Sequence, residues 1–267
     1  MPEIVPDDTF SDFIISQIMG NYLKREGRVG HKWHVSDLLF PRYAVMDRLY
    51  GRTPSRDDIG FFFTGEAYHE FLQKLLGKQD AEVRGEILDV LGTADYFDGN
   101  VLLEIKTSRK WTIPETPQEH YVEQVGYYCA IFGKIEARIL IIFPTAGRKW
   151  DGSSSSTVEV RTWKLTFTDA EIADIKAKMA SRVVDLNTAL AAKNVSGLPA
   201  CPDFKYGTIE RDSEKKIYFL KIRCPYANAG YCDCGEEMRK ELQRKNDARR
   251  IKPEQGIASR YKGHSGS

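Results

Sequence analysis

The stretch Gly92-Thr-Ala-Asp95-Tyr-Phe-Asp-Gly-Asn-Val-Leu-Leu-Glu104-Ile-Lys106-Thr107 holds two runs of strand-forming residues around an Asp-Gly-Asn turn signal. This pattern predicts two strands, Ala81 to Phe97 and Val101 to Thr107, joined by a tight turn. The second strand places a glutamate and a lysine two residues apart, and the first places an aspartate shortly before the turn. We therefore start from this hairpin.

The register of the hairpin decides which side chains meet. With Gly99-Asn100 at the centre of the turn, Asp95 lies opposite Glu104, and opposed residues share a face with Cβ atoms about 5 Å apart. Lys106 shares that face, because it lies two residues beyond Glu104. The remaining pairs would be Asp98 with Val101, Phe97 with Leu102 and Tyr96 with Leu103, while Leu103 and Ile105 would turn into the core.

Two carboxylates that face each other inside a sheet repel, which a purely structural hairpin would avoid. A divalent cation between them removes the repulsion, and hard oxygen ligands suit Mg²⁺ or Mn²⁺. Such an ion can activate water and stabilise a phosphoryl group, and a nearby lysine can assist the nucleophile. Two alternatives stay open. A turn centred on Asp98-Gly99 would set Asp95 against Leu102, and Glu104 and Lys106 could form an ordinary solvated pair.

The rest of the sequence predicts an α/β fold with a mixed central sheet flanked by helices. The helix at 64–76 has an apolar face that includes Ala67, Phe71, Leu72 and Leu75. Further helices are expected at 9–27, from Ser36 to Tyr50, at 119–132, from a Thr168-Asp169 cap to Lys193 and at 236–250, with strands at 137–143 and 157–167.

The chain divides by composition into three parts. Residues 1–198 hold the helices and strands of the α/β core, and residues 199–250 combine cysteines, prolines and glycines with a basic helix. Residues 251–267 have the composition of a flexible tail. The serine run 153–156 is expected to be a hairpin connection within the core.

Two further motifs accompany the hairpin in the order seen in a known family. Gly65-Glu-Ala-Tyr-His69 lies upstream, and Gln124-Val-Gly-Tyr-Tyr128 lies downstream. Together with Asp95 and Glu104-Ile-Lys106 they resemble the RecB-like exonuclease branch of the PD-(D/E)XK nuclease superfamily, although Ala94 replaces the proline of the superfamily name.

The resemblance implies a restriction-endonuclease-like core and a role for each motif residue. His69, Asp95, Glu104 and the Ile105 carbonyl would hold Mg²⁺ or Mn²⁺. Lys106 would assist the attacking water. Gln124 and Tyr128 would contact the DNA backbone or brace the site.

The cysteines predict a second metal site. Cys201, Cys224, Cys232 and Cys234 follow the core, and four thiols in a loop-rich region are typical of a zinc site or an iron–sulfur cluster. Cys129, on a core helix, is expected to be a bystander.

By resemblance to cysteine-containing RecB-like exonucleases, including those associated with CRISPR adaptation and phage-type members, we favour a [4Fe–4S] cluster. The segment Phe40-Pro41-Arg42, however, lacks the cysteine that those proteins carry there, and zinc stays the alternative.

Composition leaves the partner open, since a formal net charge of +1 neither indicates nor excludes a nucleic acid. No apolar run approaches the roughly 20 residues of a membrane span, and we expect a cytoplasmic protein.

The resemblance favours an exonuclease acting on single-stranded DNA in repair, recombination or phage- or CRISPR-related processing. The alternatives are a catalytically inactive DNA-binding module that uses the basic stretch Arg239 to Lys252, and a metal-dependent hydrolase of another substrate. Cleavage polarity, the choice between exonuclease and endonuclease, and oligomeric state are left open.

Overall fold

The fold is given by a computed structural model. The residues it describes are 16–17, 32–51, 56–77, 81–108, 113–146, 157–202, 207–211, 218–222, 224, 226 and 236–250. The serine run, the 251–267 tail, Cys232, Cys234 and most of the predicted 9–27 helix lie outside these residues. By its internal contacts the chain divides into unit 1, Met1–Leu39 with Thr53–Asp185, and unit 2, Phe40–Arg52 with Leu186–Ser267. The division of the sequence after residues 198 and 250 stays a prediction.

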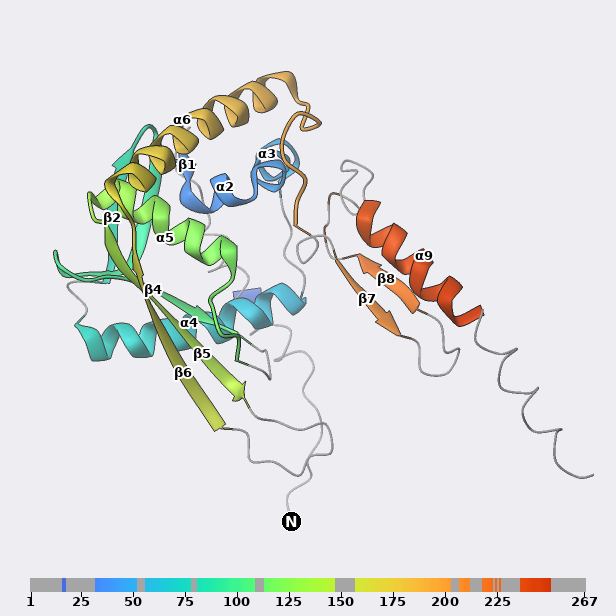
Figure 1. Ribbon diagram of the computed structural model, residues 1–267, viewed down its shortest axis with the longest axis horizontal. Coiled ribbons are helices and arrows are strands. Elements are labelled where there is room, and N and C mark those ends of the chain that lie inside the picture. Colours follow the sequence, from blue (N-terminus) through green and yellow to red (C-terminus); the bar gives the residue numbers. More distant parts are fainter. Residues whose placement is uncertain are drawn as a thin grey trace, which may run out of the picture. The chain divides into compact units, whose positions relative to one another are not determined.

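Among the described residues, unit 1 is built on a six-stranded mixed sheet with the order β1-β3-β4-β5-β6 and with β2 paired to β3 (Figure 1). The pairs β1–β3 and β4–β5 are parallel, and the others are antiparallel. The strands are β1 (Trp33–His34), β2 (Ala81–Ile87), β3 (Val90–Phe97), β4 (Leu102–Thr107), β5 (Glu136–Ala146) and β6 (Thr157–Thr166). This mixed sheet with flanking helices confirms the predicted α/β class.

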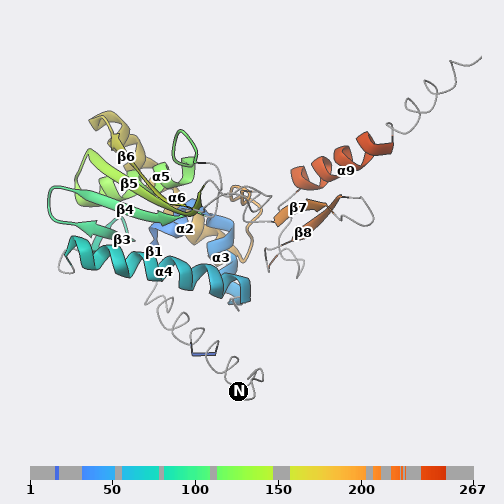
Figure 2. The same ribbon diagram turned by 90° about the horizontal axis from the view of Figure 1, so that it is seen from below.

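Helices cover both faces of the sheet. Lys106 of β4 meets Tyr121 of α5 (Glu119–Phe132), whereas its neighbour Thr107 lies beside Gly65 of α4 (Arg56–Leu76). Adjacent residues on a strand point to opposite faces, so α4 and α5 cover opposite faces of β4 (Figures 1 and 2). The predicted helix at 119–132 is confirmed residue for residue.

The start of α6 (Asp169–Ala192) follows the predicted capping pattern. The Thr168 hydroxyl accepts a hydrogen bond from the Glu171 amide at 3.2 Å, and the Glu171 carboxylate accepts one from the Thr168 amide at 2.7 Å. This reciprocal arrangement is a capping box. It begins the helix at the residue expected from the sequence.

The structure corrects the prediction of one strand from residue 81 to residue 97. The segment is a hairpin, β2–β3, that turns at Leu88 and Asp89, with φ values of 52° and 59°. Tight hairpin turns need positive φ at their central residues, which usually brings glycine or asparagine there. Leucine seldom occupies such a turn, so the sequence pattern predicted one continuous strand across this position.

Two helix predictions are also corrected. The single helix expected from Ser36 to Tyr50 is two helices, α2 (Val35–Leu39) and α3 (Pro41–Tyr50), because proline lacks an N–H and disfavours helical geometry in the residue before it. The helix predicted to start at Thr64 starts at Arg56. In addition, most of its apolar face points outward, since the side chains of Phe71 and Leu75 are exposed.

Unit 2 contains α3, the antiparallel strands β7 (Gly207–Arg211) and β8 (Tyr218–Ile222), and α9 (Glu236–Arg250). Helix α9 packs on β8 (Figure 2). The Tyr218 amide donates to the Asn246 side-chain oxygen at 3.0 Å, and the Asn246 amide group donates back to the Tyr218 carbonyl at 3.1 Å. The predicted 236–250 helix is confirmed, and the two strands before it were not foreseen.

The packing of α5 on β3 depends on Gly92. A Cβ added there would lie 2.6 Å from Ile131 Cδ1 and 3.1 Å from Tyr128 Cδ1. We expect Gly92→Ala to lower the free energy of unfolding by about 1–3 kcal/mol, because the core must shift to admit the methyl group. Urea denaturation measures the change.

The matched control is Gly60→Ala in α4, where an added Cβ meets nothing within 4 Å. The free energy of unfolding of that variant should rise by up to about 1 kcal/mol, because a helix prefers alanine to glycine by about this amount. An unchanged urea midpoint for Gly92→Ala would contradict the close approach of α5 to β3.

Candidate active site

The predicted hairpin register is confirmed where backbone pairing is present. Tyr96 pairs with Leu103 and Phe97 with Leu102. The Asp98 carboxylate holds the turn. It accepts hydrogen bonds from the amides of Asn100 and Val101, each at 2.8 Å. These bonds lower the pKa of Asp98. The alternative register, with a turn centred on Asp98-Gly99, is therefore wrong.

Asp95 lies at a break in the ladder of the sheet. On the β2 side the register skips Asp95, and Glu82, the residue opposite it, has a φ of 52°. On its other edge β3 pairs with β1 near its start and with β4 near its end. Asp95 therefore lies in a fork between β1 and β4, where its side chain can take the place of backbone pairing.

The Asp95 side chain does so with both oxygens. Oδ2 accepts a hydrogen bond from the Ile105 amide at 2.7 Å, and Oδ1 lies 3.4 Å from His69 Nδ1. Burial by itself would raise the pKa of Asp95, but His69, Lys106 and the Ile105 amide together outweigh it and lower the pKa. The carboxylate is thus held charged at neutral pH.

His69 reaches the fork from α4, one helical turn after Gly65, which lies beside Thr107. Burial would lower the pKa of His69, yet the hydrogen bond and charge of Asp95 prevail and raise it above 6.5. The Gly-x-x-x-His motif therefore brings a histidine and an aspartate together from separate elements.

Glu104 is the most deeply buried group of the site, with 3% of its surface exposed. Oε1 pairs with the ammonium of Lys106, whereas Oε2 is buried and has no hydrogen-bond partner among the described residues. Burial, and next the charge of Asp95, raise the pKa of Glu104 to about 8 against the attraction of Lys106. For Lys106 burial acts downward, but both carboxylates outweigh it and raise its pKa.

The sequence reasoning missed Tyr121, which touches the site from α5. Lys106 Nζ lies 5.5 Å from the centre of the Tyr121 ring, within the range of a cation–π contact. Burial raises the pKa of Tyr121, so the ring stays neutral. Its position three residues before Gln124 places it on the same side of the helix, and that spacing is the signal that could have found it.

Gln124 and Tyr128 form the expected i, i+4 pair. Gln124 Nε2 donates to the Tyr128 hydroxyl at 2.9 Å. Tyr128 is buried, and burial followed by the charge of Glu104 raises its pKa well above the usual value. The structure thus places this pair beside the carboxylates, with Tyr128 inside the protein rather than on its surface.

We refer to His69, Asp95, Glu104 and Lys106 as the acidic fork. Within the described residues, no three His, Cys, Asp or Glu side chains converge closely enough to form a ready-made ion site. In Glu104, one oxygen is engaged by Lys106 and the other has no partner among the described residues. The Ile105 carbonyl points to the same strand edge as its amide, which donates to Asp95.

The cysteines can be followed in part. Cys201 and Cys224 of unit 2 are both buried, and so is Cys129 of unit 1. Cys232 and Cys234 lie outside the described residues. Burial raises the pKa of Cys129 to about 12, which suits an inert core thiol.

The chain around Cys201 and Cys224 is fastened to α3. Arg42 donates to the carbonyl of Leu198 at 2.7 Å, just before the first cysteine. Tyr226, just after the second, donates to Asp47 at 2.7 Å and packs its ring against Tyr43. Both cysteine segments therefore depend on the same helix.

The basic stretch on α9 pairs part of its charge internally. Arg244 and Lys245 both lie within salt-bridge distance of Glu241, at 3.3 Å and 3.5 Å. Lys245 also lies over the Tyr218 ring. Lys252, the end of the predicted stretch, lies outside the described residues.

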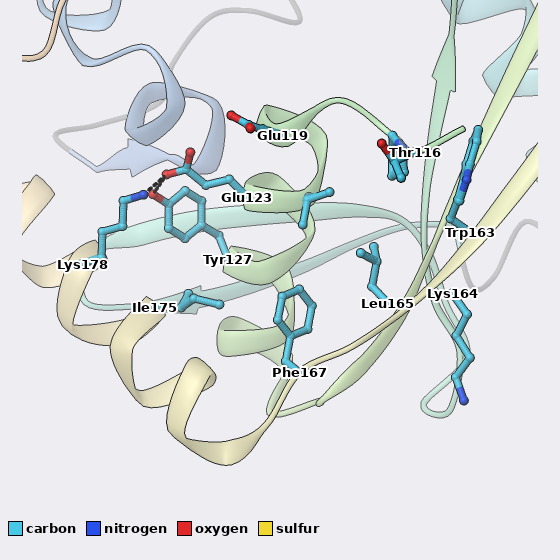
Figure 3. A pocket seen from close by; sticks show the side chains of 12 residues that line it. Thr116, Glu119, Glu123, Tyr127, Trp163, Lys164, Leu165, Phe167, Ile175 and Lys178 are labelled. Atoms are coloured by element: carbon cyan, nitrogen blue, oxygen red, sulfur yellow. Dashed lines mark hydrogen bonds and ion pairs between the residues drawn. The ribbon is translucent and has the colours of Figure 1, made fainter. Parts of the chain in front are cut away.

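A cavity of about 600 Å³ lies on the other side of α5 (Figure 3). Its walls are mostly apolar, and Glu123 near them pairs with Lys178 at 2.6 Å and accepts a hydrogen bond from Tyr127 at 2.5 Å. The lining includes Trp163 and Phe167 but no residue of the acidic fork. The cavity is therefore separate from the candidate site.

Among the described helices, none combines the length and the apolar composition that crossing a membrane requires.

No protein-family profile and no curated protein matches the chain. Solved structures resemble it loosely. A protein titled SSO0001 aligns at a TM-score of 0.46 and 18% identity, over 66% of this chain and 86% of that one. A phage-related exonuclease from Haemophilus somnus 129PT aligns at 0.41 and 15%, over 60% and 82%. The alkaline exonuclease LHK-Exo from Laribacter hongkongensis aligns at 0.41 and 16%, over 61% and 91%. At TM-scores below 0.5 these likenesses carry no weight here, and any assignment of function rests on the acidic fork.

Proposed function

We propose that the chain is a metal-dependent nuclease that hydrolyses phosphodiester bonds of DNA at the acidic fork. One observation carries the proposal. Glu104 is buried, one of its oxygens has no partner among the described residues, and a second carboxylate and a lysine lie beside it. A sheet gains no stability from such a group, because a buried acceptor without a partner costs about 1–3 kcal/mol. A cation-binding site explains it.

His69, Asp95 and Glu104, with the Ile105 carbonyl, are the groups that would hold Mg²⁺ or Mn²⁺. Carboxylate and carbonyl oxygens suit either ion. A bound ion supplies an activated water and neutralises charge on the phosphoryl group. Glu104 would offer Oε2 to the ion, since that oxygen has no partner among the described residues while Oε1 pairs with Lys106.

Lys106 lies beside the same carboxylate. Its ammonium would act as a donor for the attacking water and for a phosphate oxygen. The ring of Tyr121 keeps that ammonium in place, since a cation over an aromatic face is attracted without a competing acceptor. Gln124 and Tyr128 brace the wall behind Glu104, and the outer part of Gln124 can reach the DNA backbone.

We propose single-stranded DNA cut from an end as the preferred reaction, following the resemblance of the three motifs. Processing in repair, recombination or phage- or CRISPR-related pathways is the corresponding setting. The alternative is a catalytically inactive module that binds DNA through the same fold. A cleavage assay distinguishes it from an active nuclease.

For the cysteines we propose a structural [4Fe–4S] cluster held by Cys201, Cys224, Cys232 and Cys234, with zinc as the alternative. The burial of the first two, and the attachment of both segments to α3, support a shared site in unit 2. Its role would be to fasten loop-rich chain that has few regular elements of its own.

Cleavage of end-labelled single- and double-stranded DNA with Mn²⁺ tests the proposed activity. We expect Glu104→Ala and Lys106→Ala to lower the rate by about 100-fold or more, the usual loss when a group that stabilises the transition state is removed. Matched controls are Glu136→Ala and Lys164→Ala, a surface pair joined at 2.7 Å. These should cut as wild type does. Equal cleavage by all variants would refute the site, and DNA binding without cleavage would favour the inactive module.

The pH dependence of metal binding follows from the pKa shifts. Both Glu104, near 8, and His69, above 6.5, have raised pKa values, so their protons stabilise the metal-free protein at low pH and this stability is lost as pH rises. The ion needs the deprotonated groups. The rise in melting temperature caused by Mn²⁺ should therefore grow from pH 6.5 to about pH 8.

Differential scanning fluorimetry across this range makes the measurement. Glu104→Gln, which keeps the shape without the titrating proton, should flatten the dependence. A Mn²⁺ effect that is constant over the range in wild type would count against Glu104 as a ligand.

Metal analysis of protein purified without oxygen tests the cysteine site. We expect bound iron and a visible absorbance band, both lost in Cys201→Ser and Cys224→Ser and retained in the control Cys129→Ser. Bound zinc without colour would replace the cluster by a zinc site. Absence of both metals from wild type would reject the shared site.

A further inference from the structure

Strand β6 ends one side of the sheet and has an open outer edge (Figure 1). It pairs with β5 on its inner edge, and among the described residues no strand pairs with its outer edge. The register with β5 is regular from Glu159 to Thr166, and the register shift of this pair falls between Phe143 and Ala146 of β5. A regular strand with backbone amides and carbonyls along an open edge is a template for a further strand.

The other side of the sheet lacks this combination of length and regularity. Strand β1 has only two residues, and β2 is interrupted at Glu82, which has a φ of 52°. Natural sheets use short or irregular edge strands to avoid pairing with another chain. Strand β6 is ten residues long and has no such break between Glu159 and Thr166.

Apolar side chains are exposed on one face of β6. Val158 and Val160 are 61% and 51% exposed, and Thr162, the next residue on this face, is exposed as well. They lie on the face opposite Trp163, which lines the cavity beside α5. The register through β5 puts Glu104 on the same face as Trp163. The exposed row is therefore separate from both the cavity and the acidic fork.

We propose that β6 pairs antiparallel with β6 of a second copy of the chain, about a two-fold axis at Val160. Opposed residues of paired strands share a face, so such an axis must pass between a residue and its own copy. With Val160 on the axis, Val158 lies opposite Thr162 of the second copy, and Glu159 lies opposite Arg161. This pairing does not depend on the proposed nuclease activity.

The charges of β6 select this axis. Glu159 and Arg161 have side chains that are 42% and 56% exposed, and within one chain they lie 3.8 Å apart. An axis at either residue would set like charges opposite each other, which destabilises a strand pair. An axis at Thr162 would set the ammonium of Lys164 against Val160. The axis at Val160 instead forms the oppositely charged pair twice, so the segment is complementary to its own antiparallel copy.

The overlap of the two strands is short. It would cover Thr157 to Trp163 of each chain, and alternate pairs of an antiparallel ladder exchange two hydrogen bonds each, on the order of six to eight in all. A single pair of strands is a small interface, and small interfaces belong to weak and transient complexes. We therefore expect monomer and dimer in exchange, with a dissociation constant in the micromolar range.

Sedimentation velocity of the full-length chain over a concentration series tests the pairing. We expect wild type to shift from monomer to dimer as the concentration rises. Glu159→Arg and Arg161→Glu, each alone, set like charges opposite each other twice and should raise the dissociation constant by about ten-fold or more. The double substitution, Glu159→Arg with Arg161→Glu, brings opposite charges together again and should restore wild-type association.

An equal mixture of the two single variants tests the register. One chain then carries two arginines at the facing positions and the other carries two glutamates, so a mixed dimer should form although neither variant associates well alone. The control Glu70→Lys makes the same change of charge on α4, where Glu70 pairs with Lys74 at 2.8 Å, and should leave association unchanged.

A wild-type chain that stays monomeric at every concentration would overturn the proposal. A dimer that either single variant leaves intact would overturn it as well, because another surface would then join the two copies. Single variants that fail to combine in the mixture, or a double substitution that fails to restore association, would reject the axis at Val160.

Discussion

The hydrogen bond from the Ile105 amide to the Asp95 carboxylate joins β3 to β4 where their backbone pairing ends. A strand that leaves its neighbour exposes amides that must find another acceptor, and here a side chain provides it. The same carboxylate then meets His69 with its second oxygen. One residue thus closes the fork, orients a histidine from another element and stands next to Glu104. His69 and Glu104 are arranged around this carboxylate, which accepts the hydrogen bond that a backbone carbonyl would otherwise accept.

The side chains of the acidic fork do not balance one another's charge. Two carboxylates face one ammonium and one imidazole, and burial makes each unbalanced charge costly. Glu104 bears most of that cost, as its raised pKa and its unpartnered oxygen indicate. A proton relieves the imbalance at low pH, and a divalent cation would relieve it more fully. Competition between a proton and such a cation would be the physical basis of the proposed function.

Helix α4 belongs to two surfaces at once. On its inner side Gly65 lies beside Thr107 and His69 enters the fork. Its outer side exposes Phe71 and Leu75 next to the ion pair of Glu70 with Lys74. The orientation of the helix thus brings the histidine to Asp95 while much of its apolar face stays exposed.

Much of the site could be predicted because it is local in sequence. The turn residues and the alternation of side chains place Asp95, Glu104 and Lys106 within reach of each other, since hairpin geometry depends on a few neighbouring residues. Helical spacing likewise places Gln124 beside Tyr128. The class of fold followed from the order of apolar patterns, and the helices at 119–132 and 236–250 were found in full.

What only the tertiary structure decided involves contacts between distant elements. The turn at Leu88 and Asp89 places a leucine where positive φ is needed, which a sequence pattern does not signal, and the pairing of β2 with β3 reveals it. Tyr121 joins the site because α5 lies across β4. The acidic hairpin and the closeness of Glu104 to Lys106 follow from the sequence, but the burial of that pair and the Ile105 amide as the partner of Asp95 do not. Glu104 turns to Lys106 and Asp95 to Ile105 because burial leaves each charge only the donors that the folded chain brings near it.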